Sequence, residues 1–201
     1  MKLARIRLAR AAATLNRCRG ALPPLVLMTD DERLTDPLAA ARALPRGSMV
    51  VVRARQSSHR AKLAQSLRAV ARARGLTLLI GNDPALADRV RAAGIHLSED
   101  NARQAAHWRA KRPRWLITAA AHSLAGCACA HRCGADAAFL APVFATDSHP
   151  DGAHLGATRA RTIARLAPLA VYALGGMNAQ TASRLTDSRF AGLAAIGGLA
   201  A

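Results

Sequence analysis

A chain of 201 residues with 29 Lys and Arg and 12 Asp and Glu has a formal net charge of +17, and it is 51% hydrophobic but only 3% aromatic. That length suits one domain, and no apolar run approaches the roughly 20 residues of a membrane-spanning helix, so we expect neither several domains nor an integral membrane protein. The shortage of aromatic residues excludes an aromatic-rich β-sandwich core and favours layers of Ala, Leu, Val and Ile in an α/β protein.

Arginine carries nearly all of the positive charge, because the lysines are Lys2, Lys62 and Lys111. A field of this sign attracts phosphate esters and, less specifically, nucleic acid. The arginines are spread over helical segments, without interleaved aromatic residues that could stack on bases. We therefore expect solvated, arginine-rich helix faces and no specific nucleic-acid partner.

Four cysteines in a chain of this length do not indicate a disulfide framework, so a cytoplasmic location is expected. Cys127, Cys129, His131 and Cys133 are evenly spaced in an Ala-rich segment that is typical of a helix. On a helix Cys127 and His131 share one face and the other two share another, which cannot close a tetrahedral metal site. This cluster therefore predicts helix packing.

In chain order, the first segment is Met1 to Arg19, in which Arg alternates with Ala and Leu. It lacks the uninterrupted apolar stretch of a secretory signal, so we interpret it as a basic amphipathic helix, with a surface-bound or targeting role as the alternative. Such a helix could close the N-terminal opening of a barrel or cover a gap that a missing helix leaves.

Eight short apolar runs follow, and near-continuous apolar runs are expected of parallel strands that are buried on both faces. They are Leu25–Thr29, Met49–Arg53, Leu76–Ile80, Gly94–Leu97, Trp115–Ala119, Ala137–Leu140, Leu169–Leu174 and Gly192–Ile196. Segments with helical spacing lie between them, at Ser58–Arg74, Ala85–Ala93, Arg103–Lys111, Leu124–Cys133, Arg159–Leu166 and Ala179–Thr186.

This alternation predicts a barrel or a doubly wound sheet, and the count of eight strands favours a single (β/α)8 TIM barrel. The last helix is missing or short, and the N-terminal helix could take its place. We divide the chain into a basic helical arm at residues 1–22 and a barrel at residues 23–201. The longest connection, Ala141 to Leu155, is rich in Pro, Asp, His and Gly and is a candidate functional loop.

Paired glycines follow the last two strands. Gly175 and Gly176 come directly after the seventh apolar run, and Asn178 is a candidate N-cap for the next helix. The eighth run ends in Ile196, Gly197 and Gly198. Glycines let main-chain N–H groups approach an anion closely, and these two loops are the recurrent phosphate site of (β/α)8 barrels, although tight turns alone also require glycine.

Several stretches carry a family resemblance, in the family's order from Leu25 to the C-terminus. They are Leu27-Met28-Thr29-Asp30, Asn82-Asp83, Gly94-Ile95-His96-Leu97, Ala121-His122-Ser123, Ala141-Pro142-Val143-Phe144-Ala145-Thr146, His149-Pro150 with Leu155-Gly156, Ala173-Leu174-Gly175-Gly176-Met177, and Gly192-Leu193-Ala194-Ala195-Ile196. Together they resemble thiamine phosphate synthase and its TenI relatives. The resemblance implies a barrel of thiamine biosynthesis that binds a small phosphorylated thiazole through Gly175, Gly176, Ile196 and Gly197.

The synthase branch of the family joins a pyrimidine pyrophosphate to the thiazole phosphate with Mg²⁺, which the resemblance places on Asp83 and Asp100. Asp83-Pro84 has a structural explanation as well, because Asp at the N-cap followed by Pro is a common start of a helix. The resemblance also implies substrate contacts from Arg53, Arg55, Thr146 and Ser148. Ala120 stands where the family has a pyrophosphate-binding serine, Val51 replaces a glutamine, and Ser148-His149 replaces a Thr-Lys pair, which counts against efficient synthesis.

The tautomerase branch moves a proton between two carbons of a thiazole carboxylate phosphate and needs no cofactor. By resemblance His122 is its proton carrier, and the ordinary pKa of histidine, about 6.5, suits that role. Arg53 is the candidate for the substrate carboxylate, and His96 is expected to be structural.

Three hypotheses remain: a metal-independent thiazole tautomerase, which we favour; a Mg²⁺-dependent thiamine phosphate synthase; and a phosphate-binding regulator without catalysis. The expected partner is a small thiazole phosphate. The sequence leaves the oligomeric state open, including a homo-oligomer.

Overall fold

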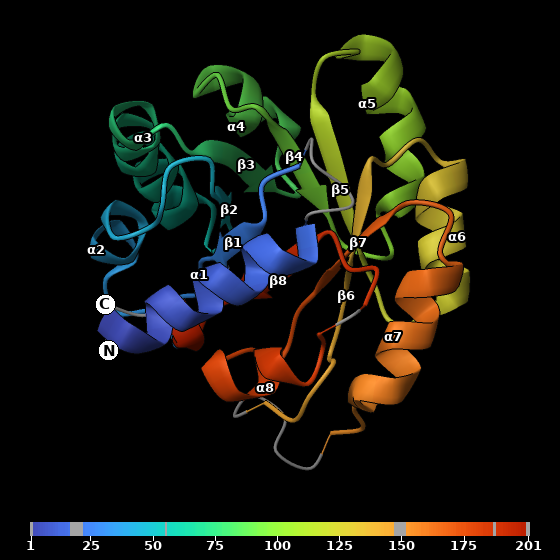
Figure 1. Cartoon of the computed structure of the whole chain (residues 1–201). Coiled ribbons are helices and arrows are strands. Elements are labelled where there is room, and N and C mark those ends of the chain that lie inside the picture. Colours follow the sequence, from blue (N-terminus) through green and yellow to red (C-terminus); the bar gives the residue numbers. More distant parts are fainter. Residues whose placement is uncertain (1, 17–21, 55, 147–151, 187, 200–201) are drawn as a thin grey trace.

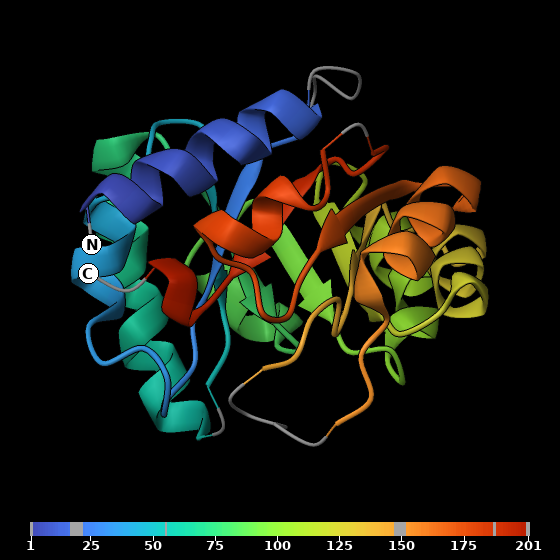
Figure 2. The same cartoon turned by 60° about the horizontal axis from the view of Figure 1, so that its bottom comes forward.

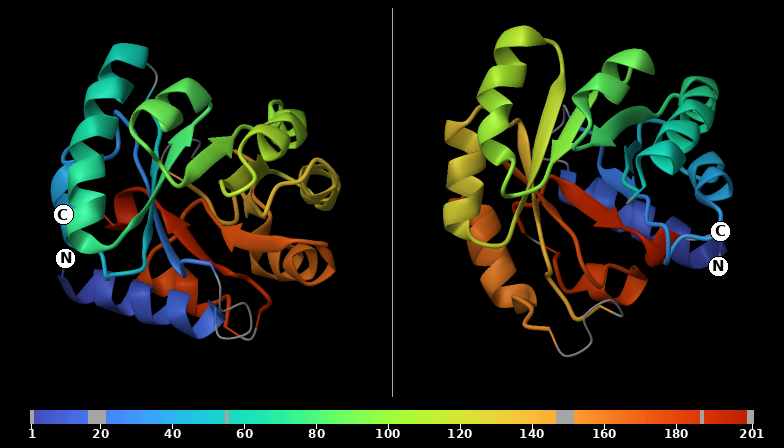
Figure 3. Two further views of the ribbon diagram at one scale, coloured as in Figure 1. Left: turned by 90° about the horizontal axis from the view of Figure 1, so that it is seen from above. Right: turned by 180° about the vertical axis from the view of Figure 1, so that it is seen from behind.

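The computed structural model describes residues 2–16, 22–54, 56–146, 152–186 and 188–199. Its centre is a ring of eight parallel strands in sequence order, closed by the pairing of β1 with β8, with helices around it (Figure 1). The predicted (β/α)8 barrel is therefore confirmed. Seen along another axis, the helices surround the strand ring (Figure 3).

The strands lie where the apolar runs predicted them, and their ends differ from the predicted ends by at most two residues. They are β1 (Leu25–Met28), β2 (Met49–Val52), β3 (Thr77–Gly81), β4 (Gly94–Leu97), β5 (Leu116–Ala121), β6 (Ala137–Leu140), β7 (Ala170–Ala173) and β8 (Gly192–Ala195). Seven of the eight are buried at every position or at all but the first. Burial on both faces explains why the runs show no polar alternation.

The helices also follow the expected order. They are α1 (Lys2–Asn16), α2 (Pro37–Arg42), α3 (Ser57–Arg74), α4 (Pro84–Arg89), α5 (Ala105–Lys111) after a 3₁₀ turn at Ala102–Gln104, α6 (Leu124–Arg132), α7 (Gly156–Leu166) and α8 (Ala179–Ser183). The helix α2 is outside the predicted set. Asp36 caps it by accepting a hydrogen bond from the Ala39 N–H at 2.8 Å, and Pro37 begins it. This is the same Asp-Pro signal that begins α4, so the sequence contained the information.

The core has two layers, one inside the barrel and one between the strands and the helices. Inside, the rings of His96, Phe139 and Tyr172 are in contact, with centroid distances of 4.7 and 4.9 Å. Burial, with the nearby positive charge of Arg53, lowers the pKa of His96 to about 3, and its Nδ1 lies 2.9 Å from the Thr118 hydroxyl. His96 is therefore a neutral member of the core, as the sequence indicated.

The N-terminal helix α1 lies on the flank of the barrel, against β8 and α8, in the position that a helix after β8 would take (Figure 2). Leu8 and Ala12 are fully buried there, and only a short 3₁₀ turn, Gly197–Leu199, follows β8. The side-chain amide of Asn16 donates to the Leu22 and Ala191 carbonyls, which anchors the end of α1 below β8. The helix thus fills the gap in the helical layer rather than closing the N-terminal opening.

That opening is closed by the segment that precedes β1. Leu22 packs against the inner core, and the Tyr172 hydroxyl donates to the Pro23 carbonyl at 2.8 Å.

Among the described residues, no helix combines the length and the apolar character needed to cross a membrane. In α6, Cys127 is buried in the outer core layer, and burial raises the pKa of its thiol to about 11, so it remains a neutral packing residue.

Candidate functional site

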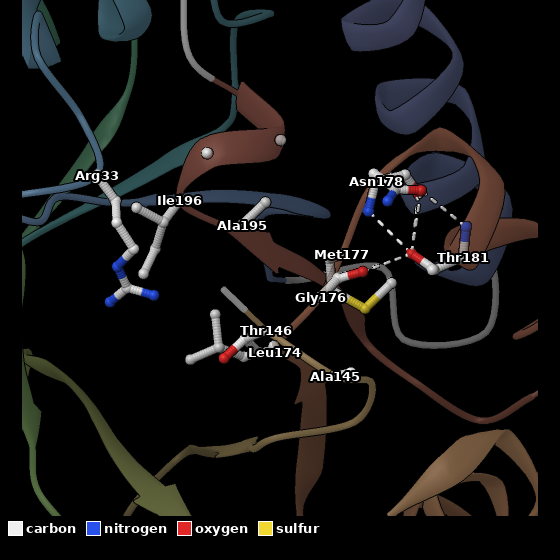
Figure 4. A pocket seen from close by; sticks show the side chains of 13 residues that line it. Arg33, Ala145, Thr146, Leu174, Gly176, Met177, Asn178, Thr181, Ala195 and Ile196 are labelled. Atoms are coloured by element: carbon white, nitrogen blue, oxygen red, sulfur yellow. Dashed lines mark hydrogen bonds between the residues drawn. The ribbon is translucent and has the colours of Figure 1, made fainter. Parts of the chain in front are cut away.

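A cavity of about 500 Å³ opens where β7 and β8 end (Figure 4). Its lining comes mainly from the loops that follow β1, β6, β7 and β8. These loops are far apart in the sequence. The residues are Arg33, Ala145, Thr146, Leu174, Gly175, Gly176, Met177, Asn178, Thr181, Ala195, Ile196, Gly197 and Gly198. The structure therefore brings together the four predicted phosphate-binding residues, and it adds Thr146 from the loop after β6.

The glycine pair after β7 is required by the backbone itself. Gly175 and Gly176 have φ values of 95° and 62°, which favour glycine. A Cβ on Gly175 would lie 2.8 Å from Pro142 Cα, and one on Gly176 would lie 2.4 Å from the Ala145 carbonyl oxygen. These residues thus pack directly on the loop after β6, so the local requirement for glycine is real, independently of any ligand.

The two glycine loops are in direct contact. A Cβ on Gly198 would lie 2.3 Å from the Met177 carbonyl oxygen, so the loop after β8 packs on the loop after β7. Gly197 differs, because among the described residues no heavy atom lies within 4 Å of its Cβ position, and its φ is not positive. Nothing in the fold requires glycine there, whereas a close approach of a ligand to the main chain would.

Within the described part of the chain, the N–H groups of Gly175, Gly176, Gly197 and Gly198 donate to no carbonyl oxygen. We call these four residues the glycine cradle. Unpaired main-chain donors around one cavity can satisfy the oxygens of an anion, as in other anion-binding loops.

Hydrogen bonds at the start of α8 stabilise the cradle. The Asn178 side chain accepts from the N–H groups of Gln180 and Thr181 at 2.9 Å, which confirms it as the predicted N-cap. The Thr181 hydroxyl donates to the Gly176 carbonyl at 2.8 Å. This bond helps to orient the peptide between Gly176 and Met177 at the cavity wall.

A cluster of two arginines on one carboxylate lies at the ends of β1 and β2. Arg33 donates from Nε and NH2 to the two oxygens of Asp30, at 3.1 and 2.6 Å, and Arg53 donates to the same carboxylate at 2.8 Å. The hydrogen bonds from Arg33 hold the pKa of Asp30 far below its usual range, so the carboxylate stays ionised. Arg33 lines the cavity, and Arg53 does not.

His122 follows β5, and its ring has a defined tautomer. Nδ1 lies 2.6 Å from the Ala141 carbonyl oxygen, which can only accept, so Nδ1 carries a proton, and in the neutral ring the lone pair is on Nε2. Nε2 is 3.6 Å from Glu99 Oε2, and the other Glu99 oxygen accepts from the His122 N–H at 3.3 Å. Sequence reasoning missed this pairing, because Glu99 comes from the loop after β4.

His122 does not line the cavity described above, but it is connected to it. Its partner Ala141 is followed by Pro142, on which Gly175 packs. The side chain of His122 is 59% exposed, so solutes can reach its ring.

The two predicted metal carboxylates lie at other loops of the same end of the barrel. Asp83 caps α4 by accepting from the Leu86 N–H at 2.9 Å, and Asp100 is exposed in the loop after β4. Asn82 has a φ of 52°, and its Oδ1 accepts from the Ser98 N–H at 2.9 Å. In the described ranges, no group of three or more His, Cys, Asp or Glu side chains is arranged to hold a metal ion.

Two predicted substrate-binding residues, Arg55 and Ser148, lie outside the residues that the structure describes. Of the remaining site residues, the cavity includes Gly175, Gly176, Ile196, Gly197 and Thr146. The others, His122, Arg53, Asp83 and Asp100, follow β5, β2, β3 and β4.

The fold and the cradle together define a class: a (β/α)8 barrel with glycine loops at the ends of its last two strands, where barrels of this fold recurrently bind phosphate. Residues 25–199 match the family model described as thiamine monophosphate synthase, and the chain belongs to this family, which acts in thiamine biosynthesis.

Named relatives agree with this assignment. A thiamine-phosphate synthase of Chlorobium luteolum is 31% identical over 179 residues, which are 87% of this chain and 84% of the relative. One from Xanthomonas campestris is 39% identical over 97 residues, or 46% of this chain and 45% of the relative. The solved structure of thiamine phosphate pyrophosphorylase from Pyrococcus furiosus has a TM-score of 0.71 at 22% identity, covering 86% and 84% of the two chains, and supports the fold.

Proposed function

We propose that this protein is a metal-independent thiazole tautomerase, which binds a phosphorylated thiazole carboxylate and moves one proton between two carbons of the ring. The observation that carries this proposal is the state of His122. Its Nδ1 donates to the Ala141 carbonyl, so the neutral ring offers Nε2 as a base at the carboxyl ends of the barrel strands.

In the proposed reaction, the glycine cradle binds the phosphate and so positions the thiazole ring. His122 Nε2 takes a proton from one ring carbon, and the electron pair left behind delocalises over the ring. The imidazolium that forms is stabilised by the carboxylate of Glu99, whose Oε2 lies 3.6 Å from Nε2. Nε2 then returns the proton to the other carbon, so the step needs no oxidant, reductant or metal.

The test is the exchange and isomerisation of a thiazole carboxylate phosphate in D₂O, followed by NMR. The substitution His122→Asn should lower kcat by about 10²- to 10⁴-fold, since it removes the proton carrier. Binding of the phosphate should change by less than about threefold, because the cradle is made of main-chain groups.

The matched control is His107→Asn, which changes an exposed histidine on α5. It should leave turnover and binding unchanged. A folded His122→Asn variant with wild-type turnover would eliminate the proposal. Thermal stabilisation by the thiazole phosphate without any turnover in the wild type would instead favour a regulator that binds without catalysis.

The second candidate is the Mg²⁺-dependent thiamine phosphate synthase, because the named relatives above carry that name. Mg²⁺ in phosphate chemistry is often held by one or two carboxylates together with substrate phosphates. Asp83 Oδ1 accepts the hydrogen bond that caps α4, so its other oxygen would bind Mg²⁺, together with Asp100. The ion would neutralise the charge of the departing pyrophosphate. Ala120 offers no hydroxyl to that pyrophosphate.

Purified protein with the pyrimidine pyrophosphate, the thiazole phosphate and Mg²⁺ tests this candidate. Formation of thiamine phosphate that Asp83→Asn abolishes would establish it. No product above the background without protein would exclude it.

A further inference from the structure

We propose that a hollow beside α7 is a second anion site, which binds a diphosphate group and shares no residue with the cavity at the glycine cradle. The hollow has a volume of about 370 Å³. Its lining residues are Thr158, Arg161, Thr162, Arg165, Ser188 and Arg189. The inference goes beyond the proposed function and does not rest on it.

The first step is geometry. Four of the lining residues belong to α7, and from Thr158 onward they follow at the third, fourth and seventh positions, so they share one face of that helix. Ser188 and Arg189 belong to the segment that joins α8 to β8, and they line the same hollow. Two separate elements of the barrel therefore bring three guanidinium groups to one place.

The second step is pairing. Elsewhere a carboxylate binds an arginine side chain, as Asp136 binds Arg109 and Asp88 binds Arg112. In the ranges that the structure describes, the three guanidinium groups of the hollow have neither an ion-pair partner nor a hydrogen-bond acceptor. Positive charges that lie near one another without a partner favour the binding of an anion between them.

The third step is the charge of the surroundings. From residue 151 onward the chain has five arginines and two acidic residues, Asp151 and Asp187. Both acidic residues lie outside the described residues. When both are counted, this stretch still has a surplus of three positive side-chain charges. The hollow therefore suits an anion that carries more than one negative charge.

The fourth step is the choice of anion. The hydroxyl groups of Thr162 and Ser188 donate to main-chain carbonyls at 3.1 and 2.6 Å, so the guanidinium groups are the main donors of the hollow. A guanidinium fork matches phosphate oxygens, and a phosphate ester carries about 1.5 to 2 negative charges at neutral pH, against one for a carboxylate. A volume of about twelve water molecules, at roughly 30 Å³ each, has room for two linked phosphate groups.

The experiment is isothermal titration calorimetry of the wild-type protein with inorganic pyrophosphate, ADP and citrate. Pyrophosphate should bind, and citrate, which has three carboxylates and no phosphate, should bind at least about tenfold more weakly. Tighter binding of ADP would identify a nucleoside diphosphate as the source of the diphosphate group, whereas equal or weaker binding would identify free diphosphate. No binding of pyrophosphate, or citrate binding of equal strength, would overturn the proposal.

Substitutions in the hollow locate the binding. Arg165→Gln and Arg189→Gln should each weaken pyrophosphate binding by about five- to twentyfold, because each removes a charge-assisted contact. Arg165→Lys should lose less, because it keeps the charge without the fork.

The matched control is Arg159→Gln, which removes the same charge from an exposed position of α7 that does not line the hollow. It should change pyrophosphate binding by less than about twofold. Equal losses in Arg159→Gln and Arg165→Gln would mean that the whole basic face attracts the anion, and this result would overturn the proposal.

Gly197→Ala separates the hollow from the glycine cradle. It changes the cradle, so a binding step that it leaves intact and that Arg165→Gln weakens belongs to the hollow. A pyrophosphate step that Gly197→Ala weakens and Arg165→Gln leaves intact would place all of the binding at the cradle and refute the proposal. Thermal melting shows whether each variant folds. Because turnover is not measured, failure of the tautomerase proposal would leave this result unaffected.

Discussion

The two halves of the barrel's functional end are made of different chemical groups. At the ends of β7 and β8, main-chain N–H groups of four glycines surround the cavity, and the surrounding loops hold them by packing. At the ends of β3 to β5, the candidate groups are side chains: Asp83, Glu99, Asp100 and His122. A main-chain site depends on backbone conformation, whereas a side-chain site can change its chemistry with a single substitution. This explains how the glycine half can be recognised in the sequence, while the reaction depends on individual side chains.

The sharpest way to break the main-chain half is Gly176→Ala. The new Cβ would lie 2.4 Å from the Ala145 carbonyl oxygen, at a φ of 62°. Left-handed strain and overpacking together should lower the free energy of unfolding by about 2 to 5 kcal/mol, and phosphate binding should be lost. Urea unfolding and calorimetry measure the two effects.

The matched control is Gly47→Ala, which has a φ of 76° but no atom within 4 Å of the Cβ position. It should cost about 1 to 2 kcal/mol of strain and leave phosphate binding intact. If Gly176→Ala kept wild-type stability and phosphate binding, the cradle would not depend on the left-handed, closely packed backbone at Gly176.

A smaller effect separates ligand binding from folding. Gly197→Ala adds a methyl group at the cavity, where no atom of the described part of the chain lies within 4 Å of the Cβ position. Stability should change by less than about 0.5 kcal/mol. Phosphate affinity should fall about tenfold, as measured by calorimetry, because the methyl group hinders close approach to the main chain. Unchanged affinity would remove the loop after β8 from the phosphate site.

The smallest expected effect concerns the side-chain half. A Cβ on Gly126 would lie 2.1 Å from Glu99 Oε1, so Gly126→Ala should push the flexible carboxylate away from His122 without changing any charge. Because the Glu99 and His122 side chains are 34% and 59% exposed, solvent screens the pair. We expect a loss of about two- to fivefold in kcat.

The same loss is expected in Glu99→Gln, with unchanged phosphate affinity in both variants. Steady-state kinetics and calorimetry separate these outcomes. If both variants keep wild-type kcat while His122→Asn loses it, His122 acts without help from Glu99.

Much of this architecture could be predicted from the chain itself. The eight strands were evident as apolar runs because a buried parallel strand needs apolar residues on both faces. The glycine pairs were evident because a backbone that approaches its neighbours closely excludes a Cβ, as at Gly176 and Gly198. The helix α2 was missed, although Asp36-Pro37 signals its start in the same way that Asp83-Pro84 signals the start of α4.

The partners of the functional side chains could not be predicted in the same way. Glu99 and His122 are 23 residues apart, and Asp30 and Arg53 are likewise 23 apart. Loop side chains follow no period, so their directions depend on which loops the closed barrel places side by side.

The sequence by itself determined the (β/α)8 barrel, the family and the two glycine loops, since all three depend on local residue types and their order. The tertiary structure alone decided which groups meet. In the folded barrel, Arg33 rather than Arg53 lines the cavity, and Glu99 lies beside His122. The physical reason is that such contacts depend on through-space distances of a few ångströms, which exist only after the strands have closed into a ring.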